Sequence, residues 1–327
     1  MIFSKVIIFA AVLACSAGHS STPDWIRLES DRPKLGTLVR IVLYTTDSLA
    51  GVQVLAEAYQ ELDRINAIIS DYDPHSELSR LNRLKTEDTI ALSPVLTGIL
   101  AASRSVFQLS SGAFDPTVKP LVDYWREIRK NGKPLRMYKV RRLKRSVGFD
   151  QIFLDPAGNR MAKGQKNMTI DLGGIGKGYL GDCLIHFLAQ RGFTRAMIDL
   201  GGDLVAGDPP PGQKGWAVGF TEEGDCQFFL NNQALAGSGG TYQFIERRGK
   251  RYSHIIDPRT GLGITAARSA FVLARNGASA DAWASALTVL GAGAGNRTFP
   301  VVWQLTDDQL TLASPDFNEY LHCKNEQ

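Results

Sequence analysis

A glycine-rich stretch, IDLGGIGKGYLGD (residues 170–182), carries the residue types that bind phosphate. It joins an apolar, strand-like run to a helix-like segment, and a glycine turn there leaves backbone N–H groups open at the start of a helix. Such N–H groups attract anions, and Lys177 adds a positive charge at the same place. We therefore predict a phosphate-binding role, although a purely structural turn would need the same glycines.

Two known phosphate-binding patterns fit this stretch only in part. A P-loop needs a hydroxyl residue after its lysine to hold magnesium, and Gly178 stands there, so the P-loop is rejected. The dinucleotide fingerprint G-x-G-x-x-G does fit residues 176–181, and Asp199 follows about twenty residues later, as the fingerprint expects. Its first glycine comes late, however, because the preceding strand is expected to end near Leu172. An NAD(P)-dependent oxidoreductase is kept only as a remote alternative.

Oxygen ligands for a metal ion are spaced along a later segment, SADAWASA. Asp281 and Ser285 are four residues apart and therefore share one face of a helix. A carboxylate and a hydroxyl so placed are hard ligands that can share one Mg²⁺ with phosphate oxygens. The alternative is an aspartate near a helix N-terminus, stabilised by the helix dipole.

Three other motifs carry candidate functional side chains. His254, in RYSHIIDPRTG, has the ordinary pKa of a proton acceptor near neutral pH, although a lone strand histidine is more often structural. Tyr72, in SDYDPHSELSRLN, is either a surface aromatic or a stacking face for a ring. Phe114 and Asp115 lie in SGAFDPTVKPLVDYW, which is an Asp-Pro turn with or without a binding role.

Hydrophobic periodicity predicts the elements that position these residues. Alternation predicts a strand over residues 37–45, and an amphipathic pattern predicts a helix over residues 48–69. A serine cap and a proline begin a second helix near Ser93. Further predictions are strands around Ile152 and over 167–172 and 196–200, a helix over 179–190, short strands over 215–257, a helix over 279–291 and a hairpin over 301–313. Early helices and late strands, with few βαβ units, indicate an α+β fold with mixed or antiparallel sheets, not a Rossmann fold.

The N-terminus has the pattern of an export signal. A lysine, an apolar run of roughly ten residues and a small-residue zone predict a signal peptide over residues 1–17. Cys15 also suits lipoprotein processing, which would attach the protein to a membrane through a lipid, while cleavage near Ala17 without lipid stays open. We expect a linker over residues 18–33 and one domain over residues 34–327, without a later membrane span.

The cysteines and the charge exclude some classes of protein. Cys183, Cys226 and Cys323 match no zinc pattern, and one disulfide of undetermined pairing is compatible with an oxidising compartment. We expect Cys183 to be a buried free thiol. The net charge of +4 does not suggest a nucleic-acid binder. The densest basic run, RRLKR (residues 141–145), is expected to be a solvated helix face or loop.

Seven motifs, in order, resemble the ApbE-like flavin transferases, which are FAD:protein FMN transferases. They are LGT (residues 35–37), SDYDPHSELSRLN, GAFDPTVKPL, DLGGIGKGYLGD, DLGGD (residues 199–203), GSGGTYQF…YSHIIDPRTG and ADAWASALTVLG. The resemblance covers nearly all of the mature chain, from about Lys34 to Gly291, and implies the T-fold-like ApbE architecture.

The resemblance also implies roles for individual residues. Asp281, Ser285 and the backbone carbonyl of Gly174 would bind the Mg²⁺ that holds the pyrophosphate of FAD. The residues implied in binding FAD are Leu35, Tyr72, Ala113, Phe114, Asp115, Asp171, Lys177 and Ile255. This chain departs from the family at Leu35, usually methionine, at Ser285, commonly threonine, and at Ala284, where some members have an acidic metal ligand.

The reaction implied is a Mg²⁺-dependent transfer of FMN from FAD to a Thr or Ser hydroxyl of an exported acceptor protein, with release of AMP. His254 as general base, with Asp281 and Lys177, is expected to carry it. The acceptor would be a flavoprotein subunit of an electron-transfer complex on the periplasmic side of a bacterial cell. FAD hydrolysis to FMN and AMP, and a non-catalytic periplasmic FAD-binding protein, remain alternatives.

Overall fold

The computed structural model describes residues 24–85, 87–220, 226–239, 244–247, 249–295, 297–307 and 310–323. The expected signal peptide and Cys15 lie outside these residues. The linker expected over residues 18–33 is wrong from residue 26 onward, because β1 (Ile26–Lys34) pairs along its whole length with β2 (Thr37–Thr45). The domain therefore begins earlier than the first quoted motif.

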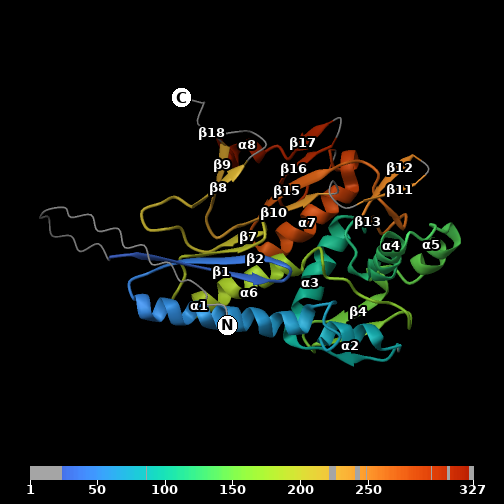
Figure 1. Ribbon diagram of the computed structural model, residues 1–327, viewed down its shortest axis with the longest axis horizontal. Coiled ribbons are helices and arrows are strands. Elements are labelled where there is room, and N and C mark those ends of the chain that lie inside the picture. The colour runs from blue at the N-terminus through green and yellow to red at the C-terminus, as the bar shows by residue number, and fades with distance from the viewer. Residues whose placement is uncertain are drawn as a thin grey trace, which may run out of the picture.

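An antiparallel sheet of eight strands forms the centre of the protein (Figure 1). Its order is β1-β2-β6-β7-β10-β15-β16-β17. Side chains alternate across it, so that Val39, Ile41 and Leu43 of β2 enter one hydrophobic cluster and Val42 enters another. The strands not yet bounded are β6 (Ala196–Leu200), β7 (Leu204–Ala206), β10 (Ala234–Gly239), β15 (Ser269–Ala274), β16 (Val302–Thr306) and β17 (Thr311–Ala313).

Helices cover one face of this sheet and complete the main core. They are α1 (Ser48–Ile69), α3 (Pro94–Leu109), α6 (Gly176–Ala189) and α7 (Gly277–Leu290). Side-chain caps begin three of them, since Asp47, Ser93 and Asn276 each accept hydrogen bonds from backbone N–H groups of α1, α3 and α7. The predicted helices over 48–69, from Ser93 and over 279–291 are thus confirmed, with small shifts at their ends.

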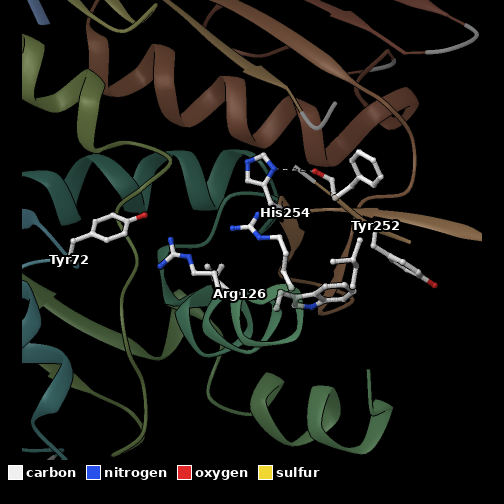
Figure 2. Close-up of a pocket in the computed structure, with 10 residues that line it drawn as sticks. Tyr72, Arg126, Tyr252 and His254 are labelled. Atoms are coloured by element: carbon white, nitrogen blue, oxygen red, sulfur yellow. Dashed lines mark hydrogen bonds between the residues drawn. The ribbon is translucent and has the colours of Figure 1, made fainter. Parts of the chain in front are cut away.

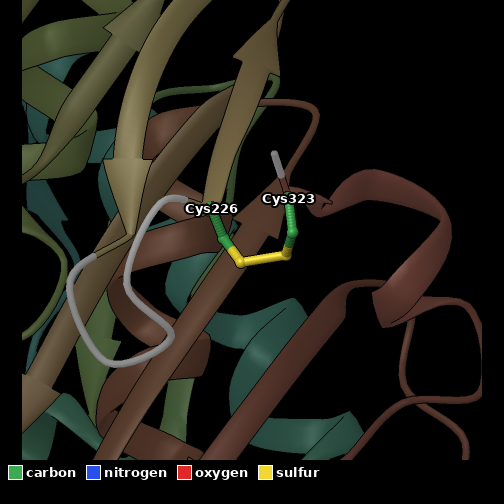
Figure 3. The surroundings of a disulfide bond; sticks show 2 residues. All are labelled: Cys226 and Cys323. Carbon is green, nitrogen blue, oxygen red and sulfur yellow. A yellow bond between two sulfur atoms is a disulfide. The ribbon is translucent and has the colours of Figure 1, made fainter. Parts of the chain in front are cut away.

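A smaller sheet covers the opposite face of the central sheet. It contains β8 (Trp216–Phe220), β9 (Cys226–Leu230) and β18 (His322–Cys323), and its core includes Phe317 of α8 (Phe317–Tyr320). Cys226 and Cys323 form a disulfide that joins β9 to β18 (Figure 3). Cys183 has a free thiol, as expected, but it is half-buried rather than fully buried.

Two helices and two hairpins form a lobe at one end of the molecule (Figure 1). The helices are α4 (Lys119–Asn131) and α5 (Met137–Lys144), and the hairpins contain β11 (Phe244–Arg247), β12 (Lys250–Ser253), β13 (Ile256–Asp257) and β14 (Leu262–Gly263). Their core includes Leu121, Trp125 and Val140. The basic run RRLKR lies on and just after α5, and its four charged side chains are exposed, which confirms the solvated face.

A third sheet of short strands contains β3 (Ile90–Ala91), β4 (Ile152–Asp155) and β5 (Arg160–Lys163), and Lys163 of β5 donates to carbonyls at the end of α2 (Glu77–Arg83). Three single turns complete the described elements: η1 (Pro116–Val118) before α4, η2 (Phe149–Gln151) before β4 and η4 (Gly291–Ala294) after α7. No helix within the described residues is long and apolar enough to cross a membrane.

The strand predicted over residues 167–172 is wrong. This segment forms no strand, and Ile170 exchanges two hydrogen bonds with the side-chain amide of Asn82, at 2.7 and 2.8 Å. The N–H of Asp171 donates to the carbonyl of Pro116 at 2.7 Å. Side chain and turn partners therefore replace a neighbouring strand, which apolar periodicity cannot reveal.

Candidate active site

Nearly all of the predicted site residues line one cleft of about 390 Å³. Eleven of the twelve do so: Tyr72, Ala113, Phe114, Asp115, Asp171, Gly174, Lys177, His254, Ile255, Asp281 and Ser285. Leu35 lines an adjoining hollow of about 460 Å³, which shares Tyr72, Gly173 and Lys177 with the cleft. Segments distant in the sequence therefore converge as the motifs predicted.

The glycine turn enters the cleft just before α6. Asp171 accepts a hydrogen bond from the N–H of Gly173 at 2.7 Å, and the carbonyl of Leu172 accepts from Gly176 at 2.7 Å. At Gly174, an added methyl group would lie 2.8 Å from the hydroxyl oxygen of Ser285. Glycine thus lets the turn approach α7 closely, which brings Gly174 and Ser285 together as the resemblance implied.

The glycines that match the dinucleotide fingerprint lie inside a helix, where two of them allow close packing against neighbouring elements. Gly176, Gly178 and Gly181 all lie within α6, not in a turn before it. A methyl group at Gly178 would overlap the backbone of Gly277, and one at Gly181 would press on Val205. The oxidoreductase alternative is therefore wrong, because the segment and the α+β fold are not those of a Rossmann domain.

Contacts between α6 and α7 fix the site residues relative to one another. Asp182 accepts hydrogen bonds from the N–H groups of Gly277 and Ala278, at 2.6 and 2.9 Å, and so caps α7. In return, the N–H of Gly178 donates to Asp281 at 3.1 Å. The first turn of α6, with Lys177, is thereby held against the first turns of α7, with Asp281.

Lys177 meets two buried carboxylates. Its ammonium group forms an ion pair with Asp203. Burial disfavours the charged form of Lys177, but the nearby carboxylates of Asp203 and Asp281 favour it more strongly. The pKa of Lys177 is therefore raised, and the group stays protonated. Burial, with Asp203 adding, raises the pKa of Asp281 to about 7. Asp203 was not predicted as a site residue, although the DLGGD motif that contains it was the available signal.

The oxygen ligands in the cleft fit Mg²⁺. Asp281, Ser285 and Gly174 offer a carboxylate, a hydroxyl and a carbonyl, and Mg²⁺ in nucleotide sites takes one or two carboxylates together with phosphates and water. Asp281 is only 6% exposed and its raised pKa reflects a poorly compensated negative charge, which a cation would relieve. Among the described residues, no three or more His, Cys, Asp or Glu side chains are grouped so that they could hold a metal ion, so phosphate oxygens would have to complete the coordination.

A charge network lies beside Tyr72. The guanidinium of Arg126 lies 5.5 Å from the centre of the Tyr72 ring (Figure 2). It also lies 3.2 Å from Asp71 and 3.4 Å from Asp171. Burial, with Asp71 adding, raises the pKa of Asp171. Tyr72 itself is 82% exposed, so a planar ligand can reach its ring. Arg126 and Asp71 were missed because only the fold brings α4 to the turn after α1.

Asp115 has a different environment from the one expected of a ligand contact. Its carboxylate accepts hydrogen bonds from the N–H and hydroxyl of Thr117, at 2.8 and 2.6 Å, and from the N–H of Phe149 at 3.2 Å. It is 5% exposed, and burial raises its pKa to about 6. Asp115 therefore shapes the wall of the cleft, next to Ala113 and Phe114, through hydrogen bonds within the protein.

His254 lies at the end of β12, on the side of the cleft facing Tyr72 (Figure 2). Its imidazole is exposed, and its Nδ1 is 3.5 Å from the hydroxyl of Ser253, which also accepts from the N–H of Ile255. A side pocket of about 290 Å³ opens beside it and shares Tyr72, Arg126 and His254 with the cleft. A group in either space can therefore reach the imidazole.

Residues 35–300 match the ApbE family. A curated FAD:protein FMN transferase of Chlamydia muridarum is 29% identical over 291 residues, which cover 88% of this chain and 89% of the relative. One from Haemophilus influenzae is 32% identical over 244 residues, 70% of each chain. Among solved structures, a histidine-to-glycine mutant of the flavin transferase ApbE from Vibrio cholerae is 27% identical, with a TM-score of 0.76 over 90% of this chain and 99% of that one.

Proposed function

This chain belongs to the ApbE family, and on that premise we propose that it is a FAD:protein FMN transferase. The observation that carries the proposal is the convergence of Lys177, the Asp281–Ser285 pair and His254 on one cleft. A positive charge, oxygen ligands for a metal and a proton acceptor are what phosphoryl transfer from a dinucleotide requires. The relatives named above support the same activity.

FAD would lie with its pyrophosphate at the glycine turn. The ammonium of Lys177 would bind anionic oxygens of the pyrophosphate, and the exposed ring of Tyr72 would pack against the isoalloxazine. Mg²⁺ held by Asp281, Ser285 and the Gly174 carbonyl would neutralise charge on the phosphates. Lys177 stays protonated next to Asp203, so its charge is available as the phosphate–oxygen bond breaks.

The acceptor would be a Thr or Ser hydroxyl of an exported flavoprotein. His254 would take the hydroxyl proton as that oxygen bonds to the FMN-side phosphorus. The bond from this phosphorus to the bridging oxygen breaks, and AMP leaves with that oxygen. FMN stays on the acceptor through a phosphoester, and no oxidant or reductant is needed. The exposure of His254 and the pocket beside it leave room for a polypeptide to approach.

One experiment separates transfer from its alternatives. The protein is mixed with FAD, Mg²⁺ and a Thr-containing acceptor of the Haemophilus influenzae relative, and AMP and acceptor-bound flavin fluorescence are measured. Transfer gives AMP and labelled acceptor in equal amounts. FMN and AMP without labelled acceptor would indicate FAD hydrolysis, and retained FAD without AMP would indicate a binding protein.

The role of His254 can be tested in the same assay. His254→Ala should lose transfer while keeping its affinity for FAD, because it removes the proton acceptor and no pyrophosphate contact. His322→Ala, in the distant β18, is the matched control and should behave as the parent protein. Normal transfer by His254→Ala would leave the cleft as the site and remove the assigned base.

We propose a periplasmic location as well, free or lipid-anchored at Cys15. The disulfide between Cys226 and Cys323 supports it, because such bonds persist in oxidising compartments. An alkaline phosphatase fusion to residues 1–24 tests export, and metabolic labelling with a fatty acid, compared with Cys15→Ser, tests the anchor.

A further inference from the structure

The segment from residue 119 to residue 145, here called the α4–α5 segment, concentrates the positive charge of the protein. It contains eleven lysines and arginines and two acidic residues, a net charge of +9. The whole chain has a net charge of +4, so the remainder carries −5. Such a separation creates a local positive field on a protein that is otherwise acidic.

This charge faces solvent. Nine of the eleven basic side chains are exposed: Arg129, Lys130, Lys133, Arg136, Lys139, Arg141, Arg142, Lys144 and Arg145. The ion pairs found in the segment engage Lys119, Arg126 and Lys133. Among the described residues, no carboxylate lies within ion-pair distance of the four charged side chains of RRLKR. The charge of the RRLKR run is therefore not neutralised by the described part of the fold.

The segment is firmly attached and adjoins the reaction cleft. Val140 of α5 is fully buried against Leu121 and Trp125 of α4 in the core of the lobe. From the same helix α4, Trp125, Arg126 and Arg129 line the side pocket at His254 (Figure 2). Through Arg129, which is exposed, the basic segment thus adjoins the space from which an acceptor hydroxyl would reach the imidazole.

We propose that the exposed basic face of the α4–α5 segment is the docking surface for an acidic region of the acceptor protein. This inference rests on the proposed transfer function. FAD cannot be the occupant, because its charge is met inside the cleft by Lys177, while the basic face covers two helices outside it. Met137 and Tyr138, which are 44% and 60% exposed, place apolar contact area among the charges, as protein interfaces commonly do.

A docking surface of this kind would change the association rate and the affinity of the acceptor, not the rate of the chemical step. Complementary charge raises the rate of association, and salt weakens it. The basic face should therefore lower KM for an acidic acceptor, leave kcat unchanged and leave KM for FAD unchanged. Those three quantities separate a docking surface from a structural contribution to the cleft.

The test uses the full-length protein and one Thr-containing peptide taken from an acceptor of the Haemophilus influenzae relative. The peptide is joined through a Gly/Ser linker to eight glutamates or to eight glutamines. At low salt, kcat/KM should be about tenfold or more higher for the glutamate-tailed peptide, and the difference should disappear in about 0.5 M NaCl. The lobe variant Arg141→Glu/Arg142→Glu/Lys144→Glu should lose this advantage.

A matched control changes the same charge elsewhere. Lys85→Glu/Lys166→Glu/Lys214→Glu alters three exposed lysines outside the segment and should keep the advantage of the glutamate tail. Equal kinetics for the two tails, or equal losses in the two variants, would overturn the docking surface while transfer itself stands. A further outcome would also overturn it. If phosphatidylglycerol vesicles bound the parent protein but not the lobe variant, and the two tails gave equal kinetics, the basic face would be assigned to membrane binding. No labelling and no AMP with either peptide would instead refute the proposed function.

Discussion

Gly178 in α6 and Gly277 in α7 are in direct backbone contact, since a methyl group added to either would overlap backbone atoms of the other. This contact lets the N–H of Gly178 reach Asp281, and it brings Lys177 beside the same carboxylate. The geometry of the cleft therefore depends on two residues without side chains.

Gly178→Ala should destabilise the protein and impair the cleft together. The new methyl group meets backbone, which cannot move aside cheaply, and such overpacking typically costs about 1–3 kcal/mol of unfolding free energy. Chemical denaturation gives the stability, and AMP release gives the activity. Gly176→Ala is the control, because its methyl group would meet only Ile69 at 3.9 Å, and it should retain stability. Equal behaviour of the two variants would contradict the role given to the contact.

The sequence predicted features that depend on local residue spacing better than features that depend on tertiary contacts. Strong periodicity predicted α1 and β2, and the i, i+4 spacing of Asp281 and Ser285 placed both on one helix facing one cleft. The family motifs predicted which turns would meet. No helix was predicted over residues 119–131, although a helical pattern is present there. Leu121, Tyr124, Trp125 and Ile128 recur at the spacing of one helix face, but the many charged residues between them obscure that pattern.

Pairs joined only by tertiary contacts were beyond sequence reasoning. Arg126 was missed beside Tyr72, and Asp203 beside Lys177, because each pair belongs to segments that meet only in the folded protein. The sequence also did not indicate that the carboxylate of Asp115 accepts hydrogen bonds from Thr117 and Phe149. Hydrophobic periodicity can be read from neighbouring residues in the sequence, but the tertiary contacts of a side chain cannot.

Removing a proposed oxygen ligand should weaken Mg²⁺ binding, so that a higher Mg²⁺ concentration is needed for activity. Ser285→Ala should raise the half-saturating Mg²⁺ concentration at least tenfold, or about 1.4 kcal/mol, and Asp281→Asn should abolish transfer at millimolar Mg²⁺. Ser279→Ala, in the first turn of the same helix, is the control and should leave the Mg²⁺ titration unchanged. A normal titration for Ser285→Ala would remove this hydroxyl from the proposed metal site.

Arg126 should act on FAD binding through Tyr72 and Asp171. Arg126→Ala removes the guanidinium that pairs with both Asp71 and Asp171, and of these two Asp71 keeps an ion pair with Lys119. We therefore expect KM for FAD to rise about tenfold while kcat changes less. Arg126→Lys should recover part of the loss, because it keeps the charge but not the planar group near the Tyr72 ring. A loss confined to kcat would contradict a positioning role.

The cap of α7 predicts a dependence of stability on pH. Burial raises the pKa of Asp182 to about 6, above the ordinary value of 3.8 that the unfolded chain has. Between about pH 4 and pH 6 the unfolded state has lost this proton and the folded state still holds it. The free energy of unfolding must therefore fall as pH rises through that window, by at most about 3 kcal/mol from this group.

Asp182→Asn isolates that contribution. Relative to the parent protein, its unfolding free energy should increase between pH 4 and pH 6 and then level off, as followed by urea denaturation at each pH. The exposed Asp24→Asn is the control and should show no such trend. A difference that stays constant with pH, or that moves in the other direction, would show that Asp182 does not titrate as assigned.

The disulfide should stabilise the fold without supporting catalysis. Its cysteines are 97 residues apart, and disulfides typically stabilise proteins by about 2–4 kcal/mol, with larger effects expected for longer loops, chiefly by restricting the unfolded state. It joins β9 to β18 in the small sheet that packs on the opposite face of the central sheet from α6 and α7. Cys226→Ser/Cys323→Ser should therefore unfold at lower denaturant concentration yet keep its kcat and KM at temperatures where it is folded. Cys183→Ser, which removes a free thiol, should match the parent protein in stability. A folded double variant with reduced kcat would show instead that the conformation of the cleft depends on the small sheet.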